Sequence, residues 1–125
     1  MKEIYKVCNE ELVFKISVYQ LNSPLLAVKA FRKTGEPYVT VSYNPHLEYS
    51  APCNTFLVDI YACKEIKEIL KVLGAKPCMM DGNPVVGFDC VSIYQLYRLD
   101  SDTLTKMDPE GYALYLSMRS KSIGI

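Results

Sequence analysis

The sequence predicts an α+β fold in which an antiparallel sheet of about five strands carries one helix across a face and a second helix at the C-terminus. Two observations lead to this prediction. Apolar and polar residues alternate along the first third of the chain, with short turns between the alternating runs, and one later segment has apolar residues at helical spacing. The 125 residues, 50% of them hydrophobic and 22% charged, fit one domain with a single core, residues 1–125.

Three strands joined by short turns are expected in the N-terminal part. Phe14, Ile16 and Val18 alternate with more polar residues over residues 12–20, as in a strand with one buried face. Two further runs of the same character follow, each after a turn sequence, Asn-Ser-Pro and Thr-Gly-Glu-Pro. They cover residues 25–32 and 38–43. Successive strands on such short turns predict an antiparallel meander.

A helix is expected over residues 62–73, because apolar residues recur there at the i, i+3, i+4, i+7 spacing and Gly74 follows as a stop. The residues of this stripe are Ile66, Ile69, Leu70 and Leu73. One stripe of this width suits packing across one face of a sheet. We expect residues 44–54 to be an irregular loop and residues 56–59 to be a short apolar lead-in to the helix.

A hairpin and a second helix are expected after this point. Residues 77–80 and 88–99 read as two strands on either side of a turn-rich tip. Residues 108–110 are Asp-Pro-Glu, an N-cap, a proline at the first helical position and an acid in the first turn, which predict a helix over residues 109–119.

The two segments beside this helix are expected to be irregular. The acidic stretch 100–110 is interpreted as a solvated loop that leads into the helix. The tail 120–125 is expected to be loose.

Composition argues against several classes of function. Basic and acidic residues each total 14, so no overall basic field would gather phosphates. The five cysteines form no C-x-x-C pair, which argues against a disulfide framework and a zinc site. Charges near the N-terminus and the lack of a long apolar run predict a cytoplasmic protein with no membrane association. We expect no metal, no cofactor and no catalytic residue.

A cysteine-dependent enzyme remains an alternative. Cys53 and His46, the single histidine, lie in the same expected loop, where a thiol and a base could meet.

Tyrosines suggest the leading functional hypothesis, a protein-binding surface. The chain has ten tyrosines and no tryptophan, and tyrosine is enriched where proteins meet. The candidate contact residues are Tyr112, Tyr115, Tyr97, Tyr94 and Tyr49. The alternative is that these rings cover the edges of a small core, with their hydroxyls in water. A homodimer is left open.

A second surface suggests a different class of ligand. The outward side of the expected meander mixes cations with aromatic rings, as single-stranded nucleic-acid binders do. Its residues are Lys15, Tyr19, Lys29, Phe31 and Tyr38. The neutral net charge disfavours nucleic acid, so this is the alternative hypothesis.

Four short motifs resemble those of a family of unknown function carried by plasmids, conjugative elements and phages of gut bacteria. They are GEPY at 35–38, NTFLVD at 54–59, GF at 87–88 and YQLY at 94–97. The resemblance implies a small accessory protein of a mobile element and transfers no catalytic residue. Such proteins commonly bind and block, so the expected function is non-catalytic protein binding, in its sharpest form anti-CRISPR-like inhibition of a host defence nuclease.

Overall fold

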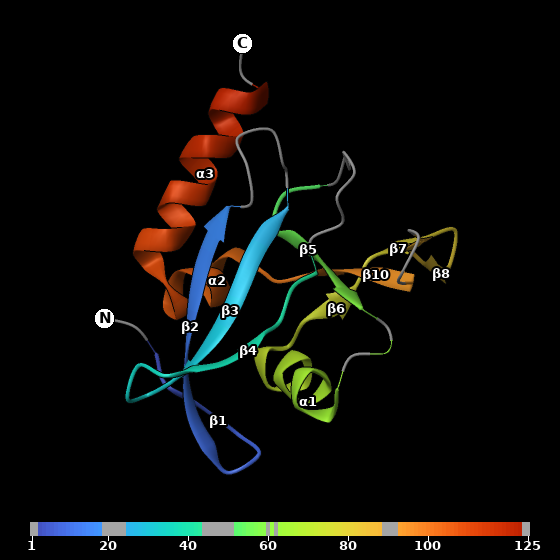
Figure 1. The fold of residues 1–125 in the computed structure, drawn as a ribbon. Helices are drawn as coiled ribbons and strands as arrows, with labels where there is room; N and C mark the ends of the chain where they lie inside the picture. The colour runs from blue at the N-terminus through green and yellow to red at the C-terminus, as the bar shows by residue number, and fades with distance from the viewer. Residues whose placement is uncertain are drawn as a thin grey trace.

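Antiparallel sheets and helices build the domain, as the sequence predicts (Figure 1). The computed structural model describes residues 3–18, 25–43, 52–59, 61, 63–88 and 93–123. Within these residues the expectation of one five-stranded sheet is wrong in detail, because the strands form two four-stranded sheets and a separate two-stranded hairpin.

The first sheet contains the expected meander and one further strand. Its order is β1 (Tyr5–Val7), β2 (Glu10–Val18), β3 (Leu26–Arg32) and β4 (Pro37–Thr40). The sequence did not predict β1, which is only three residues long. A two-residue turn joins it to β2, and both turn residues have positive φ, the geometry of a type I′ turn.

The second sheet is centred on β10 (Ile93–Arg98). Strand β5 (Thr55–Asp59) pairs along one side of β10, while β6 (Lys76–Pro77) and β9 (Val86–Phe88) pair with different ends of β10. The expected hairpin of residues 77–80 and 88–99 forms only in part, because Pro77 pairs with Tyr97 of β10 whereas Met79 and Met80 pair with Pro84 and Asn83.

Strand β5 corrects the expectation of an apolar lead-in to the helix. Phe56 and Val58 belong to the main core, whereas Leu57 belongs to a second cluster with Tyr94 and Leu96. Because both faces of β5 are buried, its sequence shows no alternation of apolar and polar residues.

A short segment after β4 joins the two sheets. The backbone N–H of Val41 donates to Val28 of β3 at 2.9 Å, and the N–H of Tyr43 donates to Leu57 of β5 at 2.6 Å. Residues 41–43 therefore pair with one sheet and then with the other, and the two sheets form one bent framework.

The described residues form three helices, α1 (Lys64–Leu73), α2 (Ser101–Met107) and α3 (Pro109–Ile123). Helix α1 confirms the prediction closely and ends at Gly74, which has a φ of 73°. Helix α3 begins where the Asp-Pro-Glu signal predicts. It continues through residue 123, beyond the predicted end at residue 119, and the expectation of a loose tail over residues 120–125 stays a prediction.

Helix α2 was not expected, because its segment reads as a solvated acidic stretch. Asp100 caps it, since its carboxylate accepts a hydrogen bond from the N–H of Thr103 at 2.7 Å. Leu104 and Met107 are fully buried on its inner side. Asp100 and Asp102 thus lie on the exposed side of a short amphipathic helix rather than in a loop, whereas Asp108 is buried.

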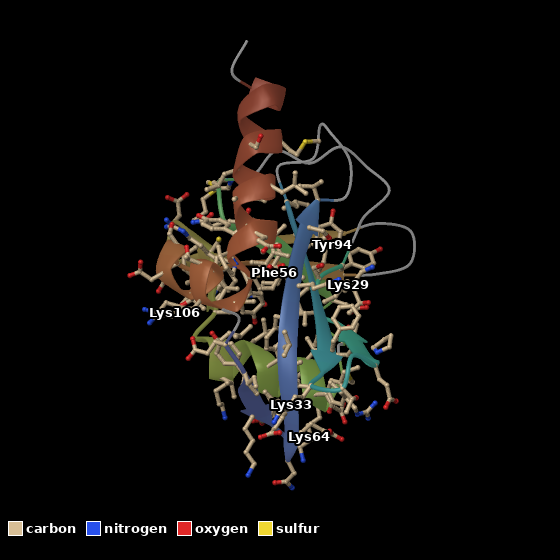
Figure 2. The ribbon with its side chains drawn as sticks, turned by 90° about the vertical axis from the view of Figure 1, so that its left-hand side faces the viewer. Lys29, Lys33, Phe56, Lys64, Tyr94 and Lys106 are labelled. Atoms are coloured by element: carbon tan, nitrogen blue, oxygen red, sulfur yellow. The ribbon has the colours of Figure 1, made fainter. Side chains whose placement is uncertain are left out.

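One main core joins the three helices to the first sheet and to β5. It contains the inner side chains of β2 and β3, the apolar stripe of α1, and buried residues of α2 and α3. Figure 2 labels Phe56 at the centre of this core. Among the described residues, no helix has the length and apolar character needed to span a membrane.

The first turn of α3 covers the edge of β2 beyond the end of β1. The carboxylate of Asp108 accepts hydrogen bonds from the N–H of Gly111 at 3.2 Å and from the N–H of Ile16 at 3.0 Å. Asp108 is therefore the N-cap that the sequence predicts, and it also satisfies a donor on the strand edge.

Candidate functional site

Three of the tyrosines expected at a partner surface lie in the interior. Tyr94, Tyr112 and Tyr115 are 4%, 7% and 0% exposed. A contact surface built on these three residues is therefore wrong. Tyr97 is half-buried and stacks on Phe56, with 6.3 Å between the ring centroids. Tyr49 lies outside the described residues.

The hydroxyls of the two α3 tyrosines bond to Asn54, at the start of β5. The Tyr112 hydroxyl donates to the Asn54 side-chain oxygen at 2.8 Å, and the Tyr115 hydroxyl accepts from the Asn54 N–H at 3.1 Å. The Asn54 amide also donates to Ser101 of α2 at 3.1 Å. The alternative with hydroxyls in water is thus also wrong for Tyr112 and Tyr115. This group, the Asn54 cluster, ties β5 to α2 and α3.

Cys53 has no base in its described contacts. Its thiol lies 3.4 Å from the side-chain oxygen of Asn54, an amide acceptor that cannot take a proton from sulfur. His46, its expected partner, lies outside the described residues. Within the described part of the chain, no three histidine, cysteine or acidic side chains come close enough to hold a metal ion.

A hairpin leaves the second sheet and exposes its whole length. It consists of β7 (Met79–Met80) and β8 (Asn83–Pro84), with Asp81 and Gly82 in the turn at φ values of 53° and 82°. All six residues are exposed, including Met79 at 55% and Met80 at 67%. Figure 1 shows this hairpin, the β7–β8 arm, on the side of the molecule away from α3. The sequence predicted the turn-rich tip but not its departure from the sheet.

The base of the arm is held by a closed set of backbone hydrogen bonds. Cys78 donates to Leu96 at 2.9 Å, Leu96 donates to Val85 at 3.0 Å, and Val85 donates to Cys78 at 2.8 Å. The side chains of Cys78 and Val85 pack against the second cluster. Burial raises the pKa of the Cys78 thiol, which favours its protonated form.

The outer face of the β2–β3 ribbon brings together three of the residues expected to bind nucleic acid. Lys15 of β2 lies directly opposite Lys29 of β3, and the Lys15 ammonium lies 5.6 Å from the centre of the Phe31 ring. These three residues help to line a shallow hollow of about 430 Å³ next to the start of α3. We call it the lysine hollow.

The other two expected residues do not join this face. Tyr38 packs against the main core and lies with Arg32, whose guanidinium carbon is 5.1 Å from the ring centre. The cause is an irregularity in the β3–β4 pairing between Ala30 and Phe31, which shifts the register just before Tyr38. Tyr19 lies outside the described residues.

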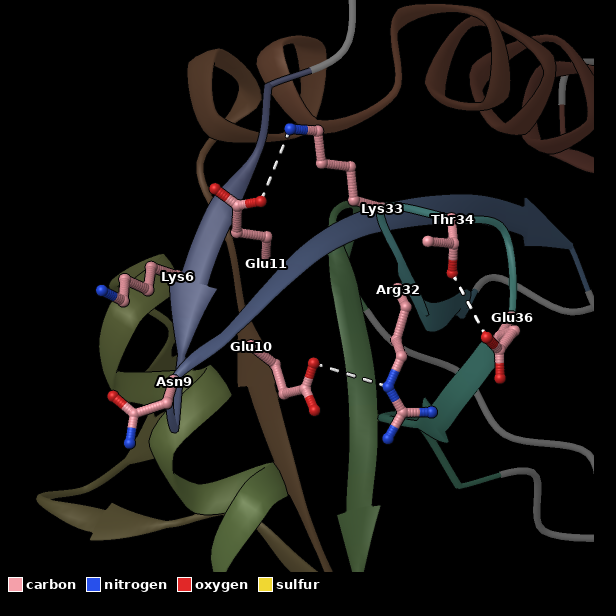
Figure 3. A pocket seen from close by; sticks show the side chains of 8 residues that line it. All are labelled: Lys6, Asn9, Glu10, Glu11, Arg32, Lys33, Thr34 and Glu36. Atoms are coloured by element: carbon pink, nitrogen blue, oxygen red, sulfur yellow. Dashed lines mark hydrogen bonds and ion pairs between the residues drawn. The ribbon is translucent and has the colours of Figure 1, made fainter.

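Cations at the far end of the same ribbon are paired with acids. Arg32 lies 3.5 Å from Glu10, and Lys33 lies 3.5 Å from Glu11 (Figure 3). Figure 2 labels Lys29 near the middle of the ribbon and Lys33 near one end. Neither Lys15 nor Lys29 forms an ion pair with a described residue, which sets the lysine hollow apart from the paired charges.

No family model, no curated protein and no solved structure matches the chain. The resemblance to accessory proteins of mobile elements therefore stays a prediction. The chemistry of the β7–β8 arm and of the lysine hollow is the basis for the functional proposals that follow.

Proposed function

We propose that this chain is a non-catalytic domain that binds a protein partner, and that the β7–β8 arm makes the central contact. One observation carries the proposal: Met79 and Met80, the most exposed methionines of the described chain, are consecutive in one strand of the hairpin and project from its two faces, which no other described element covers. Exposed apolar side chains gathered on one element are typical of an interaction site.

The chemistry of the arm favours a protein over other partners. Methionine is flexible and polarisable, and it is used at surfaces that adapt to apolar pockets of other proteins. Asp81 is the single charged residue of the arm, so the arm offers little to a phosphate backbone. A cleft lined with apolar side chains is the complementary surface.

The turn geometry of the arm and the hydrogen bonds at its base also support binding. Its type I′ turn and the hydrogen bonds at Cys78, Val85 and Leu96 hold the two strands in place before a partner arrives. A contact element that is already ordered loses less conformational entropy on binding. The other large exposed apolar residues of the described chain lie on separate elements or loops, apart from Leu114 and Leu116, which are both on α3.

The partner to test first is a bacterial defence nuclease. This choice follows from the resemblance to mobile-element proteins, in which small domains without active sites block host enzymes by binding. Inhibition of this kind is stoichiometric: nuclease activity falls in proportion to added protein and reaches its minimum near a one-to-one ratio.

The experiment compares three tagged proteins in affinity capture from bacterial lysates that express candidate defence nucleases. They are the natural sequence, the arm variant Met79→Ser/Met80→Ser, and the control Val72→Ser/Leu114→Ser, which changes exposed apolar residues elsewhere. We expect one protein at fixed ratio with the natural sequence and the control, retained in high salt because the contact is apolar. Retention of the same protein by the arm variant would contradict the role of the arm.

A further inference from the structure

We propose that the lysine hollow is a second binding site, and that it takes one nucleotide unit of a single-stranded nucleic acid. The site is separate from the β7–β8 arm and does not depend on the proposed protein binding. The site consists of Lys15 of β2 and of Lys29 and Phe31 of β3, whose side chains lie on the same outer face of the β2–β3 ribbon.

The placement of the two lysines points to an anionic ligand. Lys15 and Lys29 are directly opposed in an antiparallel pair, where like charges destabilise the sheet. Both side chains are exposed, and no described carboxylate forms an ion pair with either, in contrast to Arg32 and Lys33. A phosphate between the two ammonium groups would remove the repulsion and complement their charge.

The ring of Phe31 adds a platform for a base. Phe31 is half-buried beside the two lysines, and the Lys15 ammonium lies over its ring. A base that stacks on this ring would displace the ammonium, which could then move onto the neighbouring phosphate. Binding would thus exchange a cation–π contact for base stacking and a charge-assisted contact in one step.

The acidic residues of the hollow limit its affinity. Asp108 is buried and its carboxylate already accepts hydrogen bonds from Ile16 and Gly111. Glu110 is the exposed carboxylate among the lining residues and would repel a phosphate. Its removal should therefore strengthen binding, an outcome that a non-specific surface contact elsewhere would not produce.

The size of the hollow favours a single strand over a duplex. Its volume of about 430 Å³ lies at the small-ligand end of the usual range for binding pockets, roughly 300–1,000 Å³. The bases of a duplex are stacked on each other and cannot reach an aromatic ring on a sheet face, whereas those of a single strand can.

The test measures fluorescence anisotropy of a labelled single-stranded oligothymidine with the purified protein and its variants. We expect Lys15→Gln/Lys29→Gln and Phe31→Ala each to weaken binding roughly tenfold. Glu110→Gln should strengthen it, while Lys33→Gln, which removes a paired cation, and the arm variant Met79→Ser/Met80→Ser should leave it unchanged. Phe31→Tyr keeps a stacking ring and should bind normally, which separates stacking from a folding defect. The logarithm of the affinity should fall against the logarithm of salt with a slope of about −0.7 for each phosphate contacted.

Four results would overturn the proposal. Two concern direct binding: no binding at low salt, or unchanged binding by Lys15→Gln/Lys29→Gln. Two concern competition: a duplex of the same sequence that competes equally, or thymidine monophosphate that competes equally, which would make the site one for free nucleotides. A protein partner that the lysine variant fails to capture would instead assign this face to a protein interface. The four binding results concern the lysine hollow alone, because the role of the arm is tested by protein capture with the arm variant.

Discussion

Gly111 allows the first turn of α3 to lie against β2. A Cβ atom at this position would come within 2.2 Å of the Ile16 carbonyl oxygen and 2.4 Å of the Asp108 carboxylate. Both neighbours are fixed, one in a strand and one in a helix cap. The close approach is therefore a property of this single residue.

We predict that Gly111→Ala destabilises the domain. Alanine favours a helix by up to about 1 kcal/mol over glycine, but the clash with backbone costs about 1–3 kcal/mol, so the net effect is a loss. The measurement is urea denaturation, with Ser117→Ala on an exposed position of the same helix as the control. A Gly111→Ala protein as stable as the natural one would mean that α3 can shift away from β2.

The hydroxyl of Tyr115 is a second single-residue feature of this kind. It accepts the N–H of Asn54, and both residues are buried. We predict that Tyr115→Phe lowers the free energy of unfolding by about 1–3 kcal/mol, because the Asn54 N–H loses its acceptor in the interior. Tyr61→Phe, at a side chain that is 76% exposed, is the matched control and should have no effect. Thermal unfolding followed by circular dichroism compares the two, and equal melting temperatures would contradict the prediction.

At the scale of elements, the β1–β2 turn is held in a conformation that its residues tolerate with some strain. Cys8 and Asn9 have φ values of 50° and 66°, in the left-handed region where glycine is favoured. We predict that Asn9→Gly stabilises the hairpin by about 0.5 kcal/mol, since Asn-Gly and related pairs suit the second position of a type I′ turn. Gly82→Ala in the turn of the arm, where φ is 82°, should act in the opposite direction. Chemical denaturation of both variants tests whether the free energy of unfolding rises in Asn9→Gly and falls in Gly82→Ala.

The N-cap residue of α2, Asp100, makes a contribution to the stability of the protein that depends on pH. The N–H and hydroxyl of Thr103 bond to the Asp100 carboxylate and lower its pKa below the usual 3.8. A lowered pKa in the folded state means that the unfolded state binds more protons, so this contribution is complete above the usual pKa and is lost as pH falls through the folded value. We predict that the stability of the natural protein falls in acid and that Asp100→Asn makes the fall smaller. Denaturation midpoints from pH 7 down to pH 3 measure both slopes, and parallel slopes would contradict the prediction.

The elements that the sequence predicted are those with one buried face. Strands β2 and β3 and helix α1 each repeat a simple period, because one side meets the core and the other meets solvent. Strand β5 is buried on both faces, so its sequence does not alternate between apolar and polar residues. Helix α2 is short and its caps are acidic, so its sequence does not show the helical spacing of apolar residues.

The candidate sites followed the same logic. The alternation in β2 and β3 correctly placed Lys15, Lys29 and Phe31 on one outer face. It could not place Tyr38, because the register shift near Ala30 leaves no mark in a single sequence. The tyrosines of α3 were misplaced for a related reason: the helix is apolar on several sides, and only the packing against Asn54 shows which side is buried.

At the scale of the whole molecule, two sheets behave as parts of one structure. The main core includes residues from β1 near the N-terminus through Tyr115 of α3, and residues 41–43 bond to both sheets. The Asn54 cluster adds a link between β5 and the two C-terminal helices. The second cluster shares strand β5 with the main core, so neither of these two cores is independent of the other within the described residues.

We therefore predict that the domain unfolds in a single cooperative transition. Far-ultraviolet circular dichroism reports the helices, and fluorescence of the tyrosines, which include the buried Tyr94 and Tyr115 in different clusters, reports both sheets. The two signals should give the same midpoint in urea. The arm variant Met79→Ser/Met80→Ser should share that midpoint, because its side chains are exposed and contribute little to the core. Separate midpoints for the two signals would show instead that the second sheet unfolds independently, and the bond between Tyr43 and Leu57 would then be too weak to couple the sheets.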